Sequence, residues 1–393
     1  MGNIFQDKFN KMKIIYNISS TATNGGGMER VIVEKANYLS DVFGYEVIII
    51  TTDQKGKAGF YAFSAKIRHI DLDINYSDNN LKKTFLYRYF LYRKSLVKHR
   101  NKLESVLFQE KADIVISLSR DEKEFLYKIK DGSKKILESH RCLKPRARIE
   151  FRQAKSIILK LKVVYRLIHE TRLPKYYDKL VLLTEEDARF WEEKPNRIVI
   201  PNPLPFSSEN VAELNVKRVL SVGRISYDKG IDRLLKIWSK ISPQFPDWKL
   251  SLMGDVVDKE LITMIQELSV SHSVEILPVS QEVLTEYLSS SIYVMTSRFE
   301  GLPMVLLEAI TCGLPIVSYA FKCGPSDVIN DGVDGYLVEE GNSELFIKSL
   351  SLLMEDEELR KRMGVNAKIN SNRFALDKIM NRWNDLFLSL LNG

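Results

Sequence analysis

Two glutamates separated by seven residues are the first candidates for chemistry in this 393-residue sequence. Glu300 follows an apolar run at 292–296, and Glu308 lies in the apolar stretch that begins after Pro303. Proline suits the first turn of a helix, where its missing N–H costs nothing. The free amides of a helix start bind phosphate, so the segment predicts a diphosphate site with carboxylates placed to bind hydroxyl groups on either side. Capping or surface glutamates are the alternative interpretation.

Two cations lie in a loop upstream of these glutamates. Arg224 and Lys229 fall within residues 223–230, directly after an apolar run at 218–222. A nucleoside diphosphate that leaves a sugar gains negative charge, and Arg and Lys held in a rigid loop stabilise that charge without a metal. Solvated surface cations explain so short a string equally well. The position of the loop upstream of Glu300 in the same predicted domain favours the functional interpretation.

Three glycines and one histidine are further candidates. Gly25, Gly26 and Gly27 precede the first predicted helix, where the absence of a Cβ lets backbone amides approach a phosphate or a sugar. The loop is not GxGxxG, but Asp53 at the end of the second predicted strand keeps a dehydrogenase as an alternative. His140 follows a short predicted strand and can hydrogen-bond a sugar hydroxyl or stabilise developing positive charge, although a packed or surface histidine carries equal weight.

The remaining acid and cysteine patterns do not favour a metal site. Asp71 and Asp73 form a DxD pair, which in other proteins holds Mn²⁺ or Mg²⁺ on a nucleotide, but they end an edge-like strand and are interpreted as structural. Cys142, Cys312 and Cys323 are odd in number and lack CxxC spacing, which argues against both a disulfide framework and a zinc site. Such cysteine usage is typical of a reducing cytosol. We therefore expect no metal and no disulfide.

The elements that must position these residues alternate short β-branched runs with helices, the pattern of parallel α/β layers. Three prolines within 201–205 predict a rigid linker between two Rossmann-like, doubly wound domains that face each other across a cleft. Before the linker we expect a helix at 29–39 and strands at 13–18, 46–51, 67–72, 113–118, 135–138 and 179–183. After it we expect strands at 218–222, 249–253, 274–277, 292–296, 315–319 and 335–338, with helices at 230–241, 258–268, 281–289, 303–312 and from 343 onward.

The net charge of +7 is unevenly distributed. Residues 81–102 hold eight Lys/Arg and no acid, and residues 141–179 hold twelve against three acids. Both segments interleave apolar residues at helical spacing, so a solvated face, nucleic acid and an anionic membrane are the candidate explanations. No nucleic-acid-binding module is recognised, and we predict peripheral attachment to an anionic membrane. The sequence shows no secretory signal and no run of 18 apolar residues. We therefore expect the protein in the cytoplasm, at the inner face of the cell membrane.

These residues together resemble glycosyltransferase family 4, most specifically over 218–341 and more loosely over nearly the whole chain. The resemblance implies the GT-B fold and a retaining, metal-independent transfer without a cofactor. Glu300 is implied to contact the transferred sugar, with His140 nearby, and the two together form the implied catalytic pair. The implied donor-binding residues are Gly26, Gly27, Arg224, Lys229, Gly301, Leu302, Met304, Val305 and Glu308, of which Glu308 would bind the ribose.

The resemblance also implies which domain binds which substrate. Residues 1–199 would bind the acceptor, residues 200–374 the nucleotide-sugar donor, and the last helix, 375–393, would return to the first domain. Members of this kind build capsule, O-antigen or related glycans by moving a hexose or N-acetylhexosamine, often from UDP, to a glycan or polyprenyl-diphosphate-linked acceptor. Residues 322–325 replace a usual Gly-Gly pair, and Pro278 replaces a usual glycine, so the base and the sugar stay open.

Two other functions fit the same fold. A hydrolysing UDP-sugar epimerase would need an acidic and histidine cluster that is not evident in the sequence. A degenerate, non-enzymatic transferase would be expected to have lost at least one of the two cations and two glutamates, and all four are present.

Overall fold

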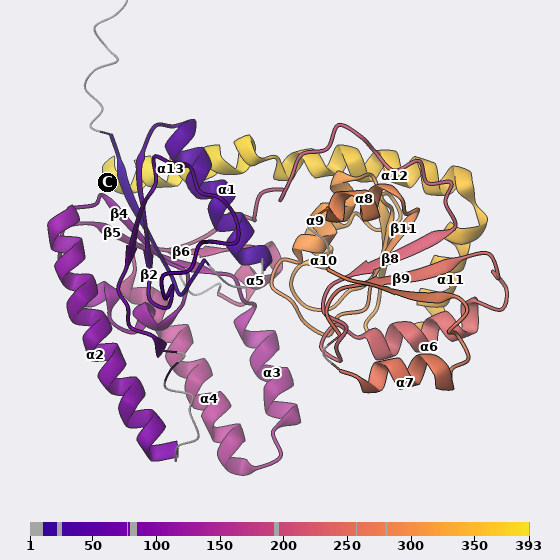
Figure 1. Cartoon of the computed structure of the whole chain (residues 1–393), viewed down its shortest axis with the longest axis horizontal. Coiled ribbons are helices and arrows are strands. Elements are labelled where there is room, and N and C mark those ends of the chain that lie inside the picture. The colour runs from indigo at the N-terminus through magenta and orange to yellow at the C-terminus, as the bar shows by residue number, and fades with distance from the viewer. Residues whose placement is uncertain are drawn as a thin grey trace, which may run out of the picture.

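The computed structural model describes residues 11–21, 26–76, 78, 85–191, 196–256, 258–279 and 282–392. Two α/β domains lie side by side, and each is built on a parallel sheet with helices packed against it (Figure 1). This is the expected architecture. Glycine 25 and residues 81–84 of the first basic segment lie outside the described residues.

The first domain contains a seven-stranded sheet in the order β3-β2-β1-β4-β5-β6-β7. The order reverses between β1 and β4, the point at which open α/β sheets bind ligands. Its central strands are apolar on both faces, as helices on both sides require. The strands are β1 (Lys13–Ile18), β2 (Glu46–Thr51), β3 (Arg68–Asp71), β4 (Ile114–Ser117), β5 (Lys134–Ser139), β6 (Lys179–Leu182) and β7 (Arg197–Val199).

The helices of this domain include a projecting group of three. In Figure 1, α2, α3 and α4 extend from one side of the domain, opposite the C-terminal helix. The predicted basic helical segment at 141–179 is split into α3 and α4 by residues 154–156, where Ser156 caps the second helix by accepting the Leu159 N–H at 3.3 Å. The helices are α1 (Gly27–Asp41), α2 (Phe85–Glu110), α3 (Leu143–Gln153), α4 (Ile157–Arg172) and α5 (Glu185–Arg189), with the 3₁₀ turns η2 (Asp121–Glu124), η3 (Leu126–Lys128) and η4 (Leu173–Tyr176).

The second domain repeats the topology with six strands in the order β10-β9-β8-β11-β12-β13. The strands are β8 (Arg218–Val222), β9 (Lys249–Met253), β10 (Val274–Leu277), β11 (Ile292–Met295), β12 (Ile316–Tyr319) and β13 (Gly335–Val338). The helices are α6 (Ile231–Ile241), α7 (Glu260–Glu267), α8 (Val283–Leu288), α9 (Met304–Thr311), α10 (Pro325–Val328), α11 (Ser343–Glu355) and α12 (Glu357–Ser371), followed by the turn η5 (Asn372–Phe374).

The chain crosses between the domains twice. The first crossing is the proline-rich segment after β7, and the second leads from η5 into α13 (Leu376–Asn392). The Leu204 N–H donates to the Phe374 carbonyl at 2.9 Å, so the two crossings are hydrogen-bonded to each other. Helix α13 then packs on the first domain, where Trp383 and Phe387 are buried in its core.

The expectation of no disulfide is wrong. Cys142, at the start of α3, is bonded to Cys323, in the loop between β12 and α10. The two cysteines are 181 residues apart in the chain, but their Cα atoms lie 6.2 Å apart. Spacing rules detect only pairs that are close in sequence, and this pair is brought together by the docking of the two domains. Cys312 is buried as a free thiol.

Candidate functional site

The two cation- and glutamate-bearing loops meet because the strands that carry them are neighbours. β8 pairs with β11 in parallel, so the loops after both strands leave the same edge of the sheet. There Lys229 forms an ion pair with Glu300, and Ser297 Oγ donates to the same carboxylate at 3.1 Å. Both charged side chains are about four-fifths buried, at 24% and 18% exposure. The predicted proximity of the cation loop to Glu300 is therefore present in the structure.

A cavity of about 140 Å³ lies at this ion pair and is lined by both domains. The second domain contributes Arg224, Lys229 and Glu300, and the first contributes His140 and the segment that follows it. The complete lining is His140, Arg141, Cys142, Arg146, Arg224, Asp228, Lys229, Phe299, Glu300 and Gly301. Four Arg and Lys side chains around so small a space make it suited to an anion.

Two of those four cations were not singled out in the sequence. Arg141 and Arg146 belong to the basic segment 141–179, whose charge we interpreted as a membrane signal. Burial, and then the neighbouring Arg146 and Arg120, lower the pKa of Arg141 from its usual value. Several guanidinium groups gathered at one cavity are typical of an anion-binding site, and the position of Arg141 directly after His140 was the available signal.

Helix α9 begins beside the cavity with free backbone amides. Pro303 precedes it without a side-chain cap, and Met304 and Val305 are its first residues, so their N–H groups are unpaired within the helix. Leu302 is buried in the core below. The helix thus begins at Met304 with uncapped amides, as expected, and anion binding there stays a prediction.

Glu308, one helical turn further along, is almost completely buried. Its carboxylate accepts a hydrogen bond from the Tyr287 hydroxyl at 2.6 Å. Burial raises the pKa of Glu308, while the Tyr287 hydrogen bond and the charge of Arg30 oppose the rise. Arg30 belongs to α1, so Glu308 faces the first domain. Tyr287 was missed, because a single tyrosine in a short helix carries no motif.

The glycine loop of the first domain reaches the same helix. A Cβ added to Gly27 would come within 3.0 Å of Met304 Cγ. Gly26 precedes α1 in an extended conformation as its N-cap. A Cβ added to Gly301 would overlap the His140 carbonyl, so the two domains touch on this side of the site as well. The predicted residues of both halves are therefore brought together at one interface.

His140 is held by a buried ion pair that sequence reasoning missed. Its Nε2 lies 3.0 Å from Glu138 Oε1, and Lys35 donates to both oxygens of that carboxylate at 2.7 and 2.9 Å. Burial acts to raise the pKa of Glu138, but Lys35 and His140 outweigh it and lower the pKa to about 2. Lys35 occupies an inward position of α1 between Ile32 and Ala36, which was the available signal.

The alternative acids lie elsewhere. Asp71 ends β3, the edge strand, and accepts from Thr51 Oγ1 at 3.1 Å. Asp53 accepts from the Thr52 hydroxyl at 2.9 Å. The lining of the interdomain cavity does not include Asp53, Asp71 or Asp73.

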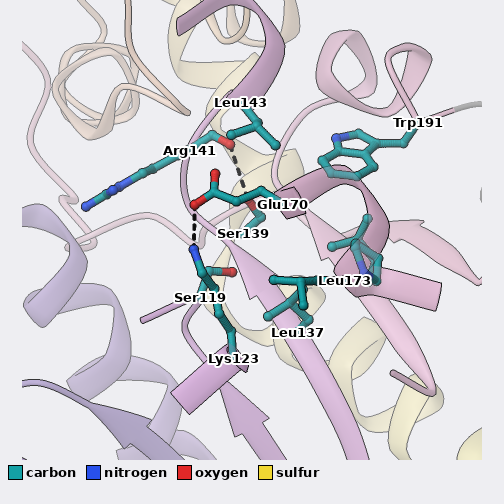
Figure 2. Close-up of a pocket in the computed structure, with 11 residues that line it drawn as sticks. Ser119, Lys123, Leu137, Ser139, Arg141, Leu143, Glu170, Leu173 and Trp191 are labelled. Carbon is teal, nitrogen blue, oxygen red and sulfur yellow. Dashed lines mark hydrogen bonds and ion pairs between the residues drawn. The ribbon is translucent and has the colours of Figure 1, made fainter. Parts of the chain in front are cut away.

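Two more cavities adjoin the site on the first domain. Figure 2 shows the smaller, of about 50 Å³, where Lys123 pairs with Glu170 at 2.7 Å and the Arg141 guanidinium points away from that pair. The larger, of about 670 Å³, lies between α3, α4 and second-domain residues including Phe299 and Lys322. Its lining mixes apolar side chains with the cations Lys144, Arg148, Arg152, Arg298 and Lys322.

Comparisons with known proteins cover both halves of the chain. Residues 206–370 match the family model for glycosyl transferases group 1. The amylovoran biosynthesis glycosyltransferase AmsD of Erwinia amylovora is 38% identical over 220 residues, 53% of this chain and 62% of that protein. An uncharacterized glycosyltransferase of Haemophilus influenzae is 36% identical over 211 residues, 52% and 60% of the two chains. The matched part of this chain thus spans about three fifths of these relatives.

Other similar proteins extend over the full length. A Campylobacter jejuni protein named as an α-1,4-N-acetyl-D-galactosaminyltransferase for a diphosphoundecaprenol-linked glycan is 27% identical, covering 97% of this chain and 100% of that one. The crystal structure of TarM superposes with a TM-score of 0.79 at 16% identity, covering 98% and 100%. A sucrose-phosphate synthase of Thermosynechococcus elongatus gives 0.78 at 16% identity, covering 97% and 99%. The fold is GT-B, as expected.

Proposed function

We propose that the protein transfers a hexose or N-acetylhexosamine from a UDP-sugar to a glycan or lipid-linked acceptor. The match of residues 206–370 to the group 1 glycosyl transferases supports this proposal. The observation that carries the proposal is the cavity between the domains, where Arg224, Lys229 and Glu300 meet cations of the opposite domain. The diphosphate would bind at the start of α9 and replace Glu300 as the partner of Lys229. Glu300 would then be free to contact the sugar.

The acceptor fits the larger cavity of the first domain. Its apolar lining and its cations suit an amphipathic molecule with a charged head, and Phe299 places one end of it beside Glu300. The Campylobacter relative is named for an acceptor of this chemistry, a glycan on diphosphoundecaprenol, and for an α linkage. Retention of configuration, implied by the resemblance to glycosyltransferase family 4, gives an α linkage from an α-linked donor.

The proposal is tested by UDP release from a panel of UDP-, GDP- and ADP-sugars, with and without a short-chain polyprenyl-diphosphate-linked sugar. We expect thermal stabilisation by UDP-sugars and release that depends on the acceptor, because a bound ligand stabilises the fold by mass action. Proton NMR of the product would report the anomeric configuration. Turnover of UDP-GlcNAc without an acceptor would favour the epimerase, and the absence of both turnover and binding would favour the degenerate transferase.

Removal of divalent ions is expected to leave transfer unchanged. The support is the set of four cations around the cavity, which supply the positive charge that a metal would otherwise bring to the diphosphate. The measurement is the initial rate after exhaustive EDTA treatment, with and without added Mn²⁺ or Mg²⁺. A rate that falls with EDTA and returns with Mn²⁺ would contradict this proposal and direct attention to Asp71 and Asp73.

Attachment to an anionic membrane is also proposed, through the projecting helices of the first domain. No helix among the described residues is long and apolar enough to cross a membrane. Helix α4 has no buried residue, and Ile157, Ile158 and Tyr165 are 69%, 63% and 73% exposed. Phe90 of α2 is 63% exposed, and Figure 1 shows α2 and α4 on the same side of the domain. Exposed apolar residues among cations are typical of an interfacial helix.

Co-sedimentation with vesicles measures this attachment. We expect binding to vesicles containing anionic lipid, weakened by salt, and little binding to neutral ones. Replacing Lys155 and Lys162 by serine should weaken binding by about 30-fold, because each cation near an anionic leaflet contributes about 1 kcal/mol. The matched control replaces Lys236 and Lys240 of α6, exposed cations of the other domain. Equal loss in both variants, or no binding at low salt, would refute the assignment.

A further inference from the structure

The disulfide Cys142–Cys323 joins the two domains at the mouth of the proposed site. Cys142 follows β5 of the first domain, and Cys323 follows β12 of the second. Both side chains are buried, at 4% and 1% exposure. Among the described residues this is the one covalent bond that links the domains away from the chain crossings. It therefore restricts their relative motion in a way that no local contact does.

The segment around Cys323 also docks on α5 of the first domain. The Cys323 N–H donates to Glu186 Oε2 at 2.7 Å, and Lys322 pairs with the same carboxylate at 2.9 Å. The Glu185 N–H donates to Asp327 Oδ1 at 2.6 Å. These contacts are not covalent, so they break and re-form without any chemical step. They can guide closure of the domains, but only the disulfide would make the closure permanent.

The segment around Cys142 and the segment around Cys323 both contact the loop that carries Glu300. The carbonyl of His140, two residues before Cys142, is packed against Gly301. Gly324, the residue after Cys323, is packed against Pro303 and the Gly301 carbonyl, so closely that a Cβ there would overlap them. The bond thus fixes the cavity walls from both domains. A nucleotide that is enclosed by both walls leaves only when they separate.

We propose that Cys142 and Cys323 form a reversible thiol–disulfide switch that holds the two domains closed over the donor cavity when oxidised and releases them when reduced. The effect on turnover rests on the proposed function, whereas the effect on domain opening does not. Disulfides in reducing compartments are usually transient or redox-sensing, so a reversible role reconciles this bond with cysteine usage that otherwise indicates free thiols. Opening or product release limits turnover in many enzymes whose active sites close over the substrate, and a covalent closure acts directly on such a step.

The oxidant is a low-molecular-weight disulfide such as glutathione disulfide. In the open state one cysteine thiolate attacks it, forms a mixed disulfide and expels one glutathione thiolate. Closure brings the second cysteine into contact, and its thiolate attacks the protein sulfur of the mixed disulfide and expels the second glutathione thiolate. Two protein thiols and one glutathione disulfide become one protein disulfide and two glutathione molecules, which carry the two protons. Reduction by a dithiol reverses the sequence.

Cys142 has an ionisable neighbour, whereas Cys312 is enclosed in the core of the second domain. Asp187 Oδ1 lies 3.5 Å from Cys142 Sγ, and burial raises the pKa of Asp187 to about 7, so this carboxyl can accept a thiol proton near neutral pH. Burial raises the pKa of the Cys312 thiol to about 12. A thiol of so high a pKa, enclosed in the domain core, exchanges poorly, which makes Cys312 an internal control.

The test compares the full chain after treatment with glutathione disulfide and after dithiothreitol. Thiol counting in denaturant should give one free thiol per oxidised chain and three per reduced chain, because the sequence contains three cysteines. Oxidation should lower turnover by about tenfold or more, with recovery on reduction, if opening controls product release. Small-angle scattering should show a smaller radius of gyration in the oxidised form. In the Cys323→Ser and Cys142→Ser variants both differences should vanish, and in Cys312→Ala both should persist.

Each adverse outcome has a distinct meaning. Three free thiols after oxidation, or equal turnover and equal radius in the two forms, would overturn the switch. A redox-dependent radius without any transfer by the reduced chain would retain the switch and reject the proposed function. Loss of sensitivity in Cys312→Ala as well as in the two serine variants would assign the effect to general damage of the fold, and would also overturn the proposal.

Discussion

Replacing Lys229 or Arg224 by alanine is expected to lower kcat/KM by about 100-fold or more, the scale of removing one group that stabilises charge in the transition state. Both side chains line the interdomain cavity, and Lys229 already holds a carboxylate in the site. Because the bridging oxygen gains negative charge as the sugar bond breaks, each cation acts more strongly on the transition state than on the bound donor. The measurement is steady-state UDP release with donor and acceptor varied separately.

The controls separate chemistry from folding. Lys236→Ala removes an exposed cation of the neighbouring helix and should leave kcat/KM unchanged. Arg224 is exposed, so its loss should leave the thermal midpoint near that of the parent protein. Arg224→Lys keeps the charge but loses the planar donor fork, and we expect partial activity. Near-parental kinetics in the alanine variants would place the diphosphate elsewhere.

The second large effect is a division of roles between the two glutamates. We expect replacement of Glu300 mainly to lower kcat, by about 100-fold, since it is assigned to the sugar where charge develops. Replacement of Glu308 is expected mainly to weaken donor binding, by about tenfold or more, the scale of losing a hydrogen bond to a charged group. Ribose contacts change little during reaction, so their loss removes uniform binding.

The structure determines which substitutions are informative. Glu308 is buried and accepts the Tyr287 hydroxyl, so Glu308→Ala leaves a buried hydroxyl without this partner and disturbs packing. Glu308→Gln and Glu300→Gln keep the size of the side chain and one acceptor oxygen while they remove the charge, and they give the cleaner comparison. Tyr287→Phe retains Glu308 but removes its hydrogen bond, and a raised KM there would identify Tyr287 as a positioning residue. The same kinetic pattern at both glutamates would refute the division of roles.

Local sequence patterns predicted the fold and half of the residues that line the cavity, because these depend on features that are close in the chain. The alternation of β-branched runs and helices indicated two parallel sheets, and Pro303 indicated the start of α9. β7 was missed because it is three residues long and directly precedes the proline-rich linker. The break between α3 and α4 was missed because apolar spacing continues through it.

The features that could not be predicted depend on residues far apart in the chain. Lys35 and Glu138 are 103 residues apart and form an ion pair only when α1 covers β5. Cys142 and Cys323 lie in different domains, so their bond depends on how the domains dock. Arg141 and Arg146 were visible as charge but not as site residues, since the cavity they line is completed by the other domain.

The return of α13 to the first domain has a consequence for synthesis on the ribosome. Domains generally fold in the order in which they emerge, the N-terminal one first. Here Ile379, Met380, Trp383, Leu386 and Phe387 belong to the core of the first domain. That core stays open until α13 has been translated, so the second domain, whose own strands and helices are already complete, can fold before the first is finished. Neither half can therefore be exchanged with a relative as a simple segment: a functional chimera has to take residues 376–392 together with the first domain.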